Sequence, residues 1–290
     1  MNFLNVLIEG WNKFWFEKSD EELTSLGFFR LCFASVLLFA YCSRTPDLEF
    51  FYSENGILPS TYRASMELFK YRPTPLEGIS NLGLLHGLHA IFLLSLLLLA
   101  LGLFTRLSTV VAYVLHMFFL NRNITIQFGL DTIGTFFLLY LCFARSGRRL
   151  SLDARFFRSE KKQTIPSHIA WRLMQIQVCV IYAYSGLEKL KGSRWWDGSA
   201  LWDVLSAGNL QRWDLSFVAH MPIVIATMVY IVLLWEIYFP ALIWVRPLRL
   251  PILAFGVAMH LGIVVFMSLP SFGFLMISLY GLFLTEEEIR

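Results

Sequence analysis

The chain has 290 residues, of which 57% are hydrophobic, 16% aromatic and only 16% charged. This balance lies well outside that of a soluble globular domain, so the composition places the chain among integral membrane proteins. The formal net charge of +3 is too small to indicate a nucleic-acid partner, and the partner that the composition predicts is the lipid bilayer.

Eight apolar windows follow one another along the chain. A bilayer core of about 30 Å needs about 20 helical residues. The windows cover residues 24–43, 81–104, 106–121, 125–144, 167–190, 222–245, 250–268 and 270–285. The sequence therefore predicts an all-α fold, a polytopic integral membrane helical bundle with about eight transmembrane helices. We expect one transmembrane domain over 24–285, between an N-terminal segment, 1–23, and a short tail, 286–290.

A Trp-rich stretch, residues 194–221, separates the fifth window from the sixth. Its tryptophans are Trp195, Trp196, Trp202 and Trp213. Tryptophan favours the headgroup region of a bilayer. The sequence therefore predicts a helix over 199–219 that lies in the membrane interface, rather than a ninth transmembrane span.

Basic residues concentrate in the loop that follows the fourth window, residues 145–166. These are Arg145, Arg148, Arg149, Arg155, Arg158, Lys161 and Lys162. Because short cytoplasmic loops are rich in Lys and Arg, we expect this loop in the cytoplasm. Eight spans then place both termini in the cytoplasm and the segments 44–80 and 191–221 outside. We expect the chain in the cell (inner) membrane.

Ionisable side chains inside the windows need partners, because a charge at the centre of a spanning helix costs about 2.5–3.5 kcal/mol. Arg30 and Glu236 have opposite charges and similar predicted depths, so we expect them to form a structural ion pair. His86 and His89 lie three residues apart on one helix. They lack the third ligand of a metal-binding pattern, so we predict no metal site and interpret them as interhelical hydrogen-bonding groups.

Polar residues form a stripe along the fifth window. Gln175, Tyr182, Ser185 and Lys189 recur at a spacing of about 3.5 residues, so they share one face of a helix. The stripe either joins neighbouring helices or lines a cavity. A partly desolvated lysine amine can act as a proton acceptor, which favours a cavity, whereas an amine extended to the surface would be a structural anchor.

A cavity with aromatic walls next to Lys189 would suit a flat, apolar ligand. Gly186 leaves room beside the lysine, and the Trp195–Trp213 segment would close the cavity from outside. We expect the ligand to be bound by Tyr182, Ser185, Gly186, Trp196 and His260.

Several segments together resemble the horizontally transferred transmembrane (HTTM) domain, a family that includes the membrane part of vitamin K-dependent gamma-carboxylase. The most informative is WRLMQIQVCVIYAYSGLEKLKGSRWWDGSALW. The others are FFRLCFASVLLFAY, FYSENGILP, NRNITIQFGLD, RRLSLDA, WEIYFPALIW and AMHLGIVVFMSLPSFGFLMISL. They occur in the family's order over about residues 24–285.

The resemblance implies a catalytic lysine that deprotonates vitamin K hydroquinone within a Gly-x-x-Lys-Leu motif, and Lys189 occupies that position here. The implied cofactor is therefore reduced vitamin K or a menaquinone-type quinol. The family's histidine has no clear counterpart, because its region reads Asn121-Arg122-Asn123 and His116 lies earlier. The candidate catalytic residues are Lys189, His116 and Asp131, the last residue of NRNITIQFGLD.

Three functions remain open. The first is a quinol-dependent membrane enzyme of the carboxylase-epoxidase type with Lys189 as its base. The second is a non-catalytic role in the maturation or export of a secreted peptide, as in related HTTM proteins. The third is transport of a small solute, for which the centre of the bundle offers few polar residues besides His260.

Overall fold

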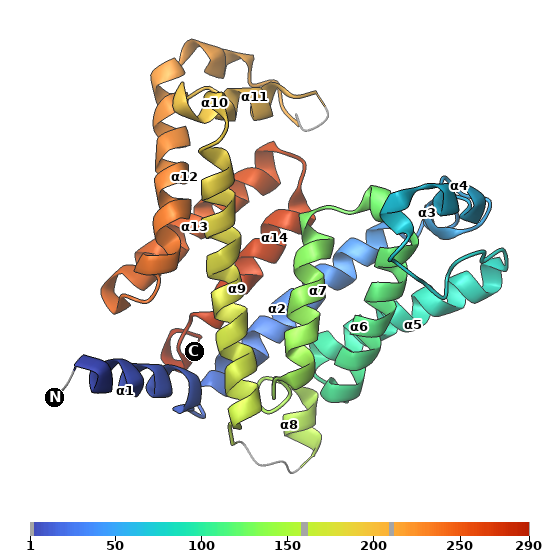
Figure 1. Cartoon of the computed structure of the whole chain (residues 1–290), viewed down its shortest axis with the longest axis horizontal. Coiled ribbons are helices and arrows are strands. Elements are labelled where there is room, and N and C mark those ends of the chain that lie inside the picture. The colour runs from blue at the N-terminus through green and yellow to red at the C-terminus, as the bar shows by residue number, and fades with distance from the viewer. Residues whose placement is uncertain (1–2, 158–161, 209–211, 290) are drawn as a thin grey trace. The chain divides into compact units, whose positions relative to one another are not determined.

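The computed structural model describes residues 3–157, 162–208 and 212–289, and all its regular elements are helical (Figure 1). The ends of the expected terminal segments, 1–2 and 290, lie outside this description, as do residues 158–161 of the 145–166 loop. Within the chain, residues 1–171 and 285–290 form unit 1, and residues 172–284 form unit 2. The expectation of one transmembrane domain over 24–285 stays a prediction.

A helix lies in each of the eight apolar windows. Among the described residues, four helices are long and apolar enough to cross a membrane: α2 (Glu22–Ser43), α5 (Leu82–Leu101), α12 (Pro222–Leu242) and α13 (Arg246–Phe266). The other windows hold α6 (Thr105–Arg122), α7 (Gly129–Phe143), α9 (Ile165–Lys189) and α14 (Pro270–Leu279). The all-α membrane fold is confirmed, and the total of eight spans stays a prediction.

Unit 1 is built on a continuous series of helix contacts, in which α2 packs on α5, α5 on α6, and α6 on α7. Aromatic rings fill its core: the Phe29 and Phe33 rings stack at 5.1 Å, and both contact Phe137 of α7. Its shorter elements are α1 (Phe3–Phe16), α3 (Leu48–Tyr52), α4 (Ser60–Ser65), η1 (Glu67–Phe69), η2 (Ile124–Ile126), α8 (Leu152–Phe156) and α15 (Glu286–Ile289).

The end of α5 is held by Arg30, a fully buried residue of α2. Its guanidinium donates to the backbone carbonyls of Leu99 and Ala100 in the last helical turn, where carbonyls lack the usual amide partner four residues on, and the Gly102 amide also donates to Leu99. Gly102 ends α5 in the left-handed conformation, with φ of 68°, and an added Cβ would lie 2.7 Å from Arg30 Nη1. Arg30 and Gly102 together therefore fix where α5 stops.

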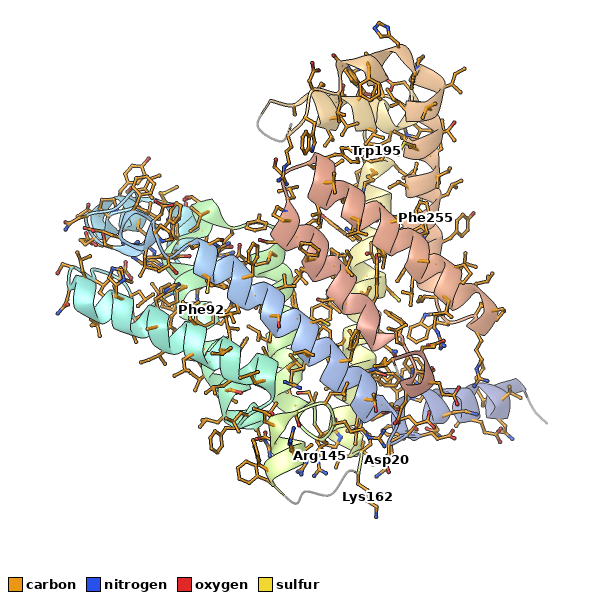
Figure 2. The ribbon with its side chains drawn as sticks, turned by 180° about the vertical axis from the view of Figure 1, so that it is seen from behind. Asp20, Phe92, Arg145, Lys162, Trp195 and Phe255 are labelled. Carbon is orange, nitrogen blue, oxygen red and sulfur yellow. The ribbon has the colours of Figure 1, made fainter. Side chains whose placement is uncertain are left out.

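Charged residues gather at one end of unit 1. Asp20, Arg145 and Lys162 all lie at this end in Figure 2, although Asp20 is far from the other two in the sequence. The Gln163 amide donates to Asp20 Oδ1 at 2.6 Å, which joins the N-terminal segment to the loop before α9. The basic loop and the start of α2 therefore lie at the same end of unit 1.

In unit 2, α12 packs on α13, and α13 packs on α14, which continues into η4 (Tyr280–Leu282). The helix expected over 199–219 is shorter. α10 (Ser193–Trp196) and α11 (Ala200–Ser206) precede η3 (Ser216–His220), and residues 209–211 of the expected helix lie outside the described residues. α11 ends where Ala207 takes an extended conformation, directly before Gly208, because glycine is a poor helix former.

Candidate functional site

Lys189, the last residue of α9, forms an ion pair with Glu236 of α12. Its Nζ donates to Glu236 Oε1 at 2.7 Å and Oε2 at 2.5 Å, and to Ser185 Oγ at 2.6 Å. The Trp195 ring centroid lies 5.2 Å from the same amine. The two side chains are only 20% and 8% exposed, so the pair is largely removed from solvent. The amine thus faces an acid, a hydroxyl and an aromatic ring.

Gly186 allows α9 and α12 to approach closely enough for this pair. A Cβ at Gly186 would lie 2.9 Å from Ile237 Cγ1 and 3.2 Å from the Ile237 backbone nitrogen. Those separations are tighter than normal van der Waals contact, so a larger residue would push the helices apart. Gly186 therefore acts by positioning Lys189 against Glu236.

A second polar group lies further along the same helix face. The Tyr182 hydroxyl is 2.9 Å from His260 Nε2 and 2.6 Å from the Tyr280 hydroxyl, so it joins α9 to α13 and η4. All three side chains are buried. His260 Nδ1 has no hydrogen-bond partner among the residues that the structure describes. A buried ring nitrogen of this kind can bind a polar group of a ligand.

His116 and Asp131 belong to a different polar group, in unit 1. The Tyr41 hydroxyl lies 2.9 Å from His116 Nδ1 and 3.3 Å from Asp131 Oδ1, and Arg44 donates to both Asp131 oxygens. His116 Nε2 lies 3.1 Å from both the Asp131 carbonyl and Thr135 Oγ1. Both His116 nitrogens therefore have partners within unit 1.

The expected ligand-binding residues fall into two sets. Ser185 and Gly186 lie at Lys189, and Tyr182 and His260 form the adjacent group in unit 2. Trp196 lies elsewhere: it is 63% exposed, and its Nε1 donates to the Leu190 carbonyl at 2.8 Å. The cavity expected at Lys189 stays a prediction, as do the catalytic roles of Lys189, His116 and Asp131.

The partners of Arg30 and Glu236 differ from those expected. Arg30 binds carbonyl oxygens of unit 1, those of Leu99 and Ala100 and also those of Ser146 and Leu150. Glu236 binds Lys189 in unit 2. The physical reason is that an arginine can be satisfied by backbone carbonyls alone, so it needs no carboxylate at its own depth.

Sequence reasoning missed four contributors to these groups: Tyr41, Arg44, Tyr280 and the role of Trp195. An ion pair of Arg44 could have been predicted, since Arg44 directly follows the first apolar window and could reach an acid at the same membrane boundary. The sequence does not show which of Trp195 and Trp196 faces Lys189, because this depends on the helical register of α10 after the turn at Gly192.

Comparison with known proteins identifies one family. The family model of the HTTM domain matches residues 18–287, nearly the whole chain, which confirms the resemblance seen in the sequence motifs. No curated protein matches the chain, and no solved structure matches it.

Proposed function

The chain belongs to the HTTM domain family, and on that premise we propose that it is a membrane enzyme acting on a lipid quinol, with Lys189 as the base. The observation that carries this proposal is the contact of the Lys189 amine with both oxygens of a buried carboxylate. An acid at this distance can take a proton from the ammonium and return it.

The proton would move in two steps. Transfer from Lys189 Nζ to Glu236 leaves a neutral amine and a neutral acid, so the nitrogen lone pair becomes free. The neutral Lys189 amine would then be able to accept a proton from the hydroxyl of a quinol held beside it. Ser185, whose hydroxyl lies 2.6 Å from Nζ, orients the amine through both steps.

The residues of unit 2 suit a quinol of the vitamin K or menaquinone type. Trp195 supplies a flat apolar surface 5.2 Å from the amine. His260 Nδ1, unpartnered among the described residues, supports a polar ligand group in the same unit. Aromatic walls with a few polar groups are the usual composition of a small-molecule site.

The test uses the full chain in lipid nanodiscs supplied with menaquinol. We expect Lys189→Met to abolish the oxidation of menaquinol by dissolved oxygen, the electron acceptor in the assay, because it removes the base while keeping much of the bulk. The matched control is Lys191→Met, since Lys191 is exposed and pairs with Glu188 instead. Loss of activity in the Lys189 variant alone supports the proposal, and equal activity in both variants contradicts it.

A non-catalytic role in the maturation or export of a secreted peptide is the second candidate. One observation favours it: the Lys189–Glu236 pair also joins α9 to α12, which a purely structural pair would do. In that case Lys189→Met lowers the melting temperature in detergent, while no variant changes quinone binding measured by quenching of tryptophan fluorescence.

The same proposal includes an orientation in the cell (inner) membrane. Arg145, Arg148, Arg149 and Lys162 belong to one loop region at one end of unit 1, where Figure 2 shows Arg145 and Lys162. The tendency of basic loops to stay inside supports a cytoplasmic position for this end and for both termini.

A further inference from the structure

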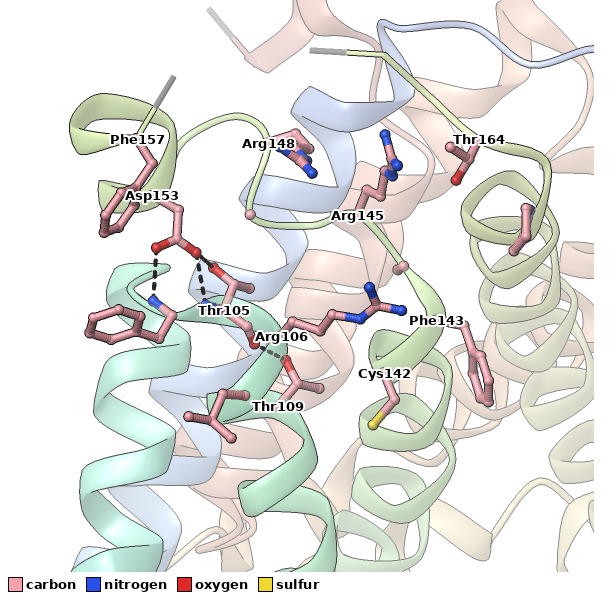
Figure 3. Close-up of a pocket in the computed structure, with 15 residues that line it drawn as sticks. Thr105, Arg106, Thr109, Cys142, Phe143, Arg145, Arg148, Asp153, Phe157 and Thr164 are labelled. Atoms are coloured by element: carbon pink, nitrogen blue, oxygen red, sulfur yellow. Dashed lines mark hydrogen bonds between the residues drawn. The ribbon is translucent and has the colours of Figure 1, made fainter. Parts of the chain in front are cut away.

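A cavity of about 740 Å³ opens at the end of unit 1 where α6 and α9 begin and α7 ends (Figure 3). Its volume lies within the range of about 300–1,000 Å³ that small-molecule sites occupy. Much of its wall is apolar. Phe104 and Phe143, two of its lining residues, are 56% and 61% exposed, so the wall continues onto the outer surface of unit 1.

Within the described ranges, three arginines line the cavity: Arg106 from the first turn of α6, and Arg145 and Arg148 from the loop after α7. Figure 3 shows the Arg106 side chain reaching towards the end of α7, near Cys142 and Phe143. Arg145 donates to the Lys162 carbonyl at 3.1 Å. Neither Arg106 nor Arg148 forms an ion pair within the described part of the chain.

Asp153, the one acid among the described residues that line the cavity, is already engaged. Its Oδ1 accepts the Phe104 amide at 2.8 Å, and its Oδ2 accepts the Thr105 amide at 2.8 Å and the Thr105 hydroxyl at 2.7 Å. These are the free donors at the start of α6, so Asp153 caps that helix. The guanidinium groups are therefore left as an excess of positive charge beside an apolar wall.

We propose that this cavity binds an anionic phospholipid, with the phosphate on Arg106, Arg145 and Arg148 and an acyl chain along the wall of Phe104 and Phe143. Arginine matches phosphate because its planar fork can donate two parallel hydrogen bonds. The location supports a lipid rather than a soluble phosphate, since the cavity lies at the ends of apolar helices and its wall is exposed. Basic pockets at the ends of spanning helices are suited to anionic headgroups.

The experiment measures lipid binding to the full chain by native mass spectrometry from detergent. Phosphatidylglycerol, phosphatidylcholine and glycerol 3-phosphate are titrated separately. We expect phosphatidylglycerol to bind more tightly than phosphatidylcholine, and glycerol 3-phosphate to leave phosphatidylglycerol binding unchanged at equal concentration. In the double variant Arg106→Gln/Arg148→Gln, binding of phosphatidylglycerol should weaken about tenfold or more, because charge-assisted hydrogen bonds are lost.

The matched control is Arg155→Gln, which removes an exposed arginine of α8 that does not line the cavity. It should leave the affinity for phosphatidylglycerol unchanged. Arg106 and Arg148 make no ion pair in the described residues, so the double variant, measured without lipid, should keep the melting temperature of the unaltered protein. Equal affinity for both lipids, equal weakening in the control, or competition by glycerol 3-phosphate would each overturn the proposal.

Discussion

The Arg44 guanidinium donates one hydrogen bond to each carboxylate oxygen of Asp131, at 2.8 and 2.9 Å. Arg44 directly follows α2, and Asp131 lies in the first turn of α7, so this paired contact joins the two helices. Asp131 is 1% exposed and Arg44 13% exposed at their side chains. The Phe128 amide also donates to Asp131 at 3.2 Å, so the same carboxylate caps α7.

Removing Arg44 should therefore leave a buried carboxylate without its main partner. We expect Arg44→Met to cost about 3–5 kcal/mol, by analogy with buried pairs in soluble cores, and to lower the melting temperature in detergent clearly. Arg194→Met is the control, because the ion pairs of Arg194 are exposed and such pairs contribute about 0–1 kcal/mol. Similar melting temperatures for both variants would show that the Arg44 contact is not important for stability.

Gly102 should tolerate no side chain. Gly102→Ala places a Cβ in the left-handed conformation and 2.7 Å from Arg30 Nη1, so we expect a loss of more than about 1 kcal/mol of stability. Gly87→Ala is the matched control in the same helix, because a Cβ there meets nothing within 4 Å. It should be neutral or stabilising by up to about 1 kcal/mol. Thermal unfolding in detergent measures both.

Tyr182→Phe should destabilise unit 2. The change removes the hydroxyl that lies 2.9 Å from His260 Nε2, and both ring nitrogens of His260 then lack partners within the described residues. A buried group left unsatisfied costs about 1–3 kcal/mol. Tyr238→Phe serves as the comparison, since Tyr238 is 54% exposed, and its melting temperature should match that of the unaltered protein. A Tyr182→Phe variant with the same melting temperature as the Tyr238→Phe variant would rule out this role.

The orientation can be tested by labelling single cysteines after replacing Cys32, Cys42, Cys142 and Cys179. An impermeant thiol reagent should label Tyr71→Cys from outside intact cells, because Tyr71 is 83% exposed and lies in the segment assigned to the outer side. Arg155→Cys should react only after the membrane is permeabilised. Efficient labelling at position 155 in intact cells would reverse the proposed topology.

The segment between α3 and α4 should lose stability in acid. Hydrogen bonds from the Ser60 hydroxyl and amide keep the pKa of Glu54 below its ordinary value, so they stabilise the charged form. Their contribution is complete above the unfolded pKa, about 4.3, and is lost as the pH falls through the lower folded pKa.

Ser60→Ala should therefore lower the melting temperature at pH 7. The difference in melting temperature between this variant and the unaltered protein should become smaller as the pH falls. Ser65→Ala is the control, because the Ser65 hydroxyl donates to the Tyr62 carbonyl rather than to an acid. Its effect should not depend on pH. A constant difference between the Ser60 variant and the unaltered protein from pH 7 to pH 3 would argue against the Glu54 contact.

The positions of the long helices could be predicted from the sequence, because apolar windows of that length have few alternatives to a membrane helix. The shared face of Gln175 and Tyr182 was also predictable, since it depends only on helical periodicity, and both side chains are buried. Partners across helices were not predictable. Glu236 could be assigned a depth, but its neighbour depends on how α12 is rotated about its own axis.

Arg30 illustrates a second limit. Its acceptors are main-chain oxygens of Leu99, Ala100, Ser146 and Leu150, and a main-chain oxygen has no sequence signature. A search for a complementary residue type therefore leads to an acid such as Glu236. The cavity lined by Arg106 and Arg148 was hidden for a related reason, because it forms where loops of unit 1 meet.

The same acceptors set an order for biosynthesis. Arg30 leaves the ribosome long before Ser146 and Leu150 exist, so the nascent α2 carries an arginine whose final acceptors are still missing. Arg30 of the nascent α2 can gain its acceptors in stages, first when the end of α5 has been synthesised and finally when residue 150 has been synthesised. A chain that stops at Phe143 would retain every helix from α1 to α7 and still lack two of the carbonyls that hold Arg30.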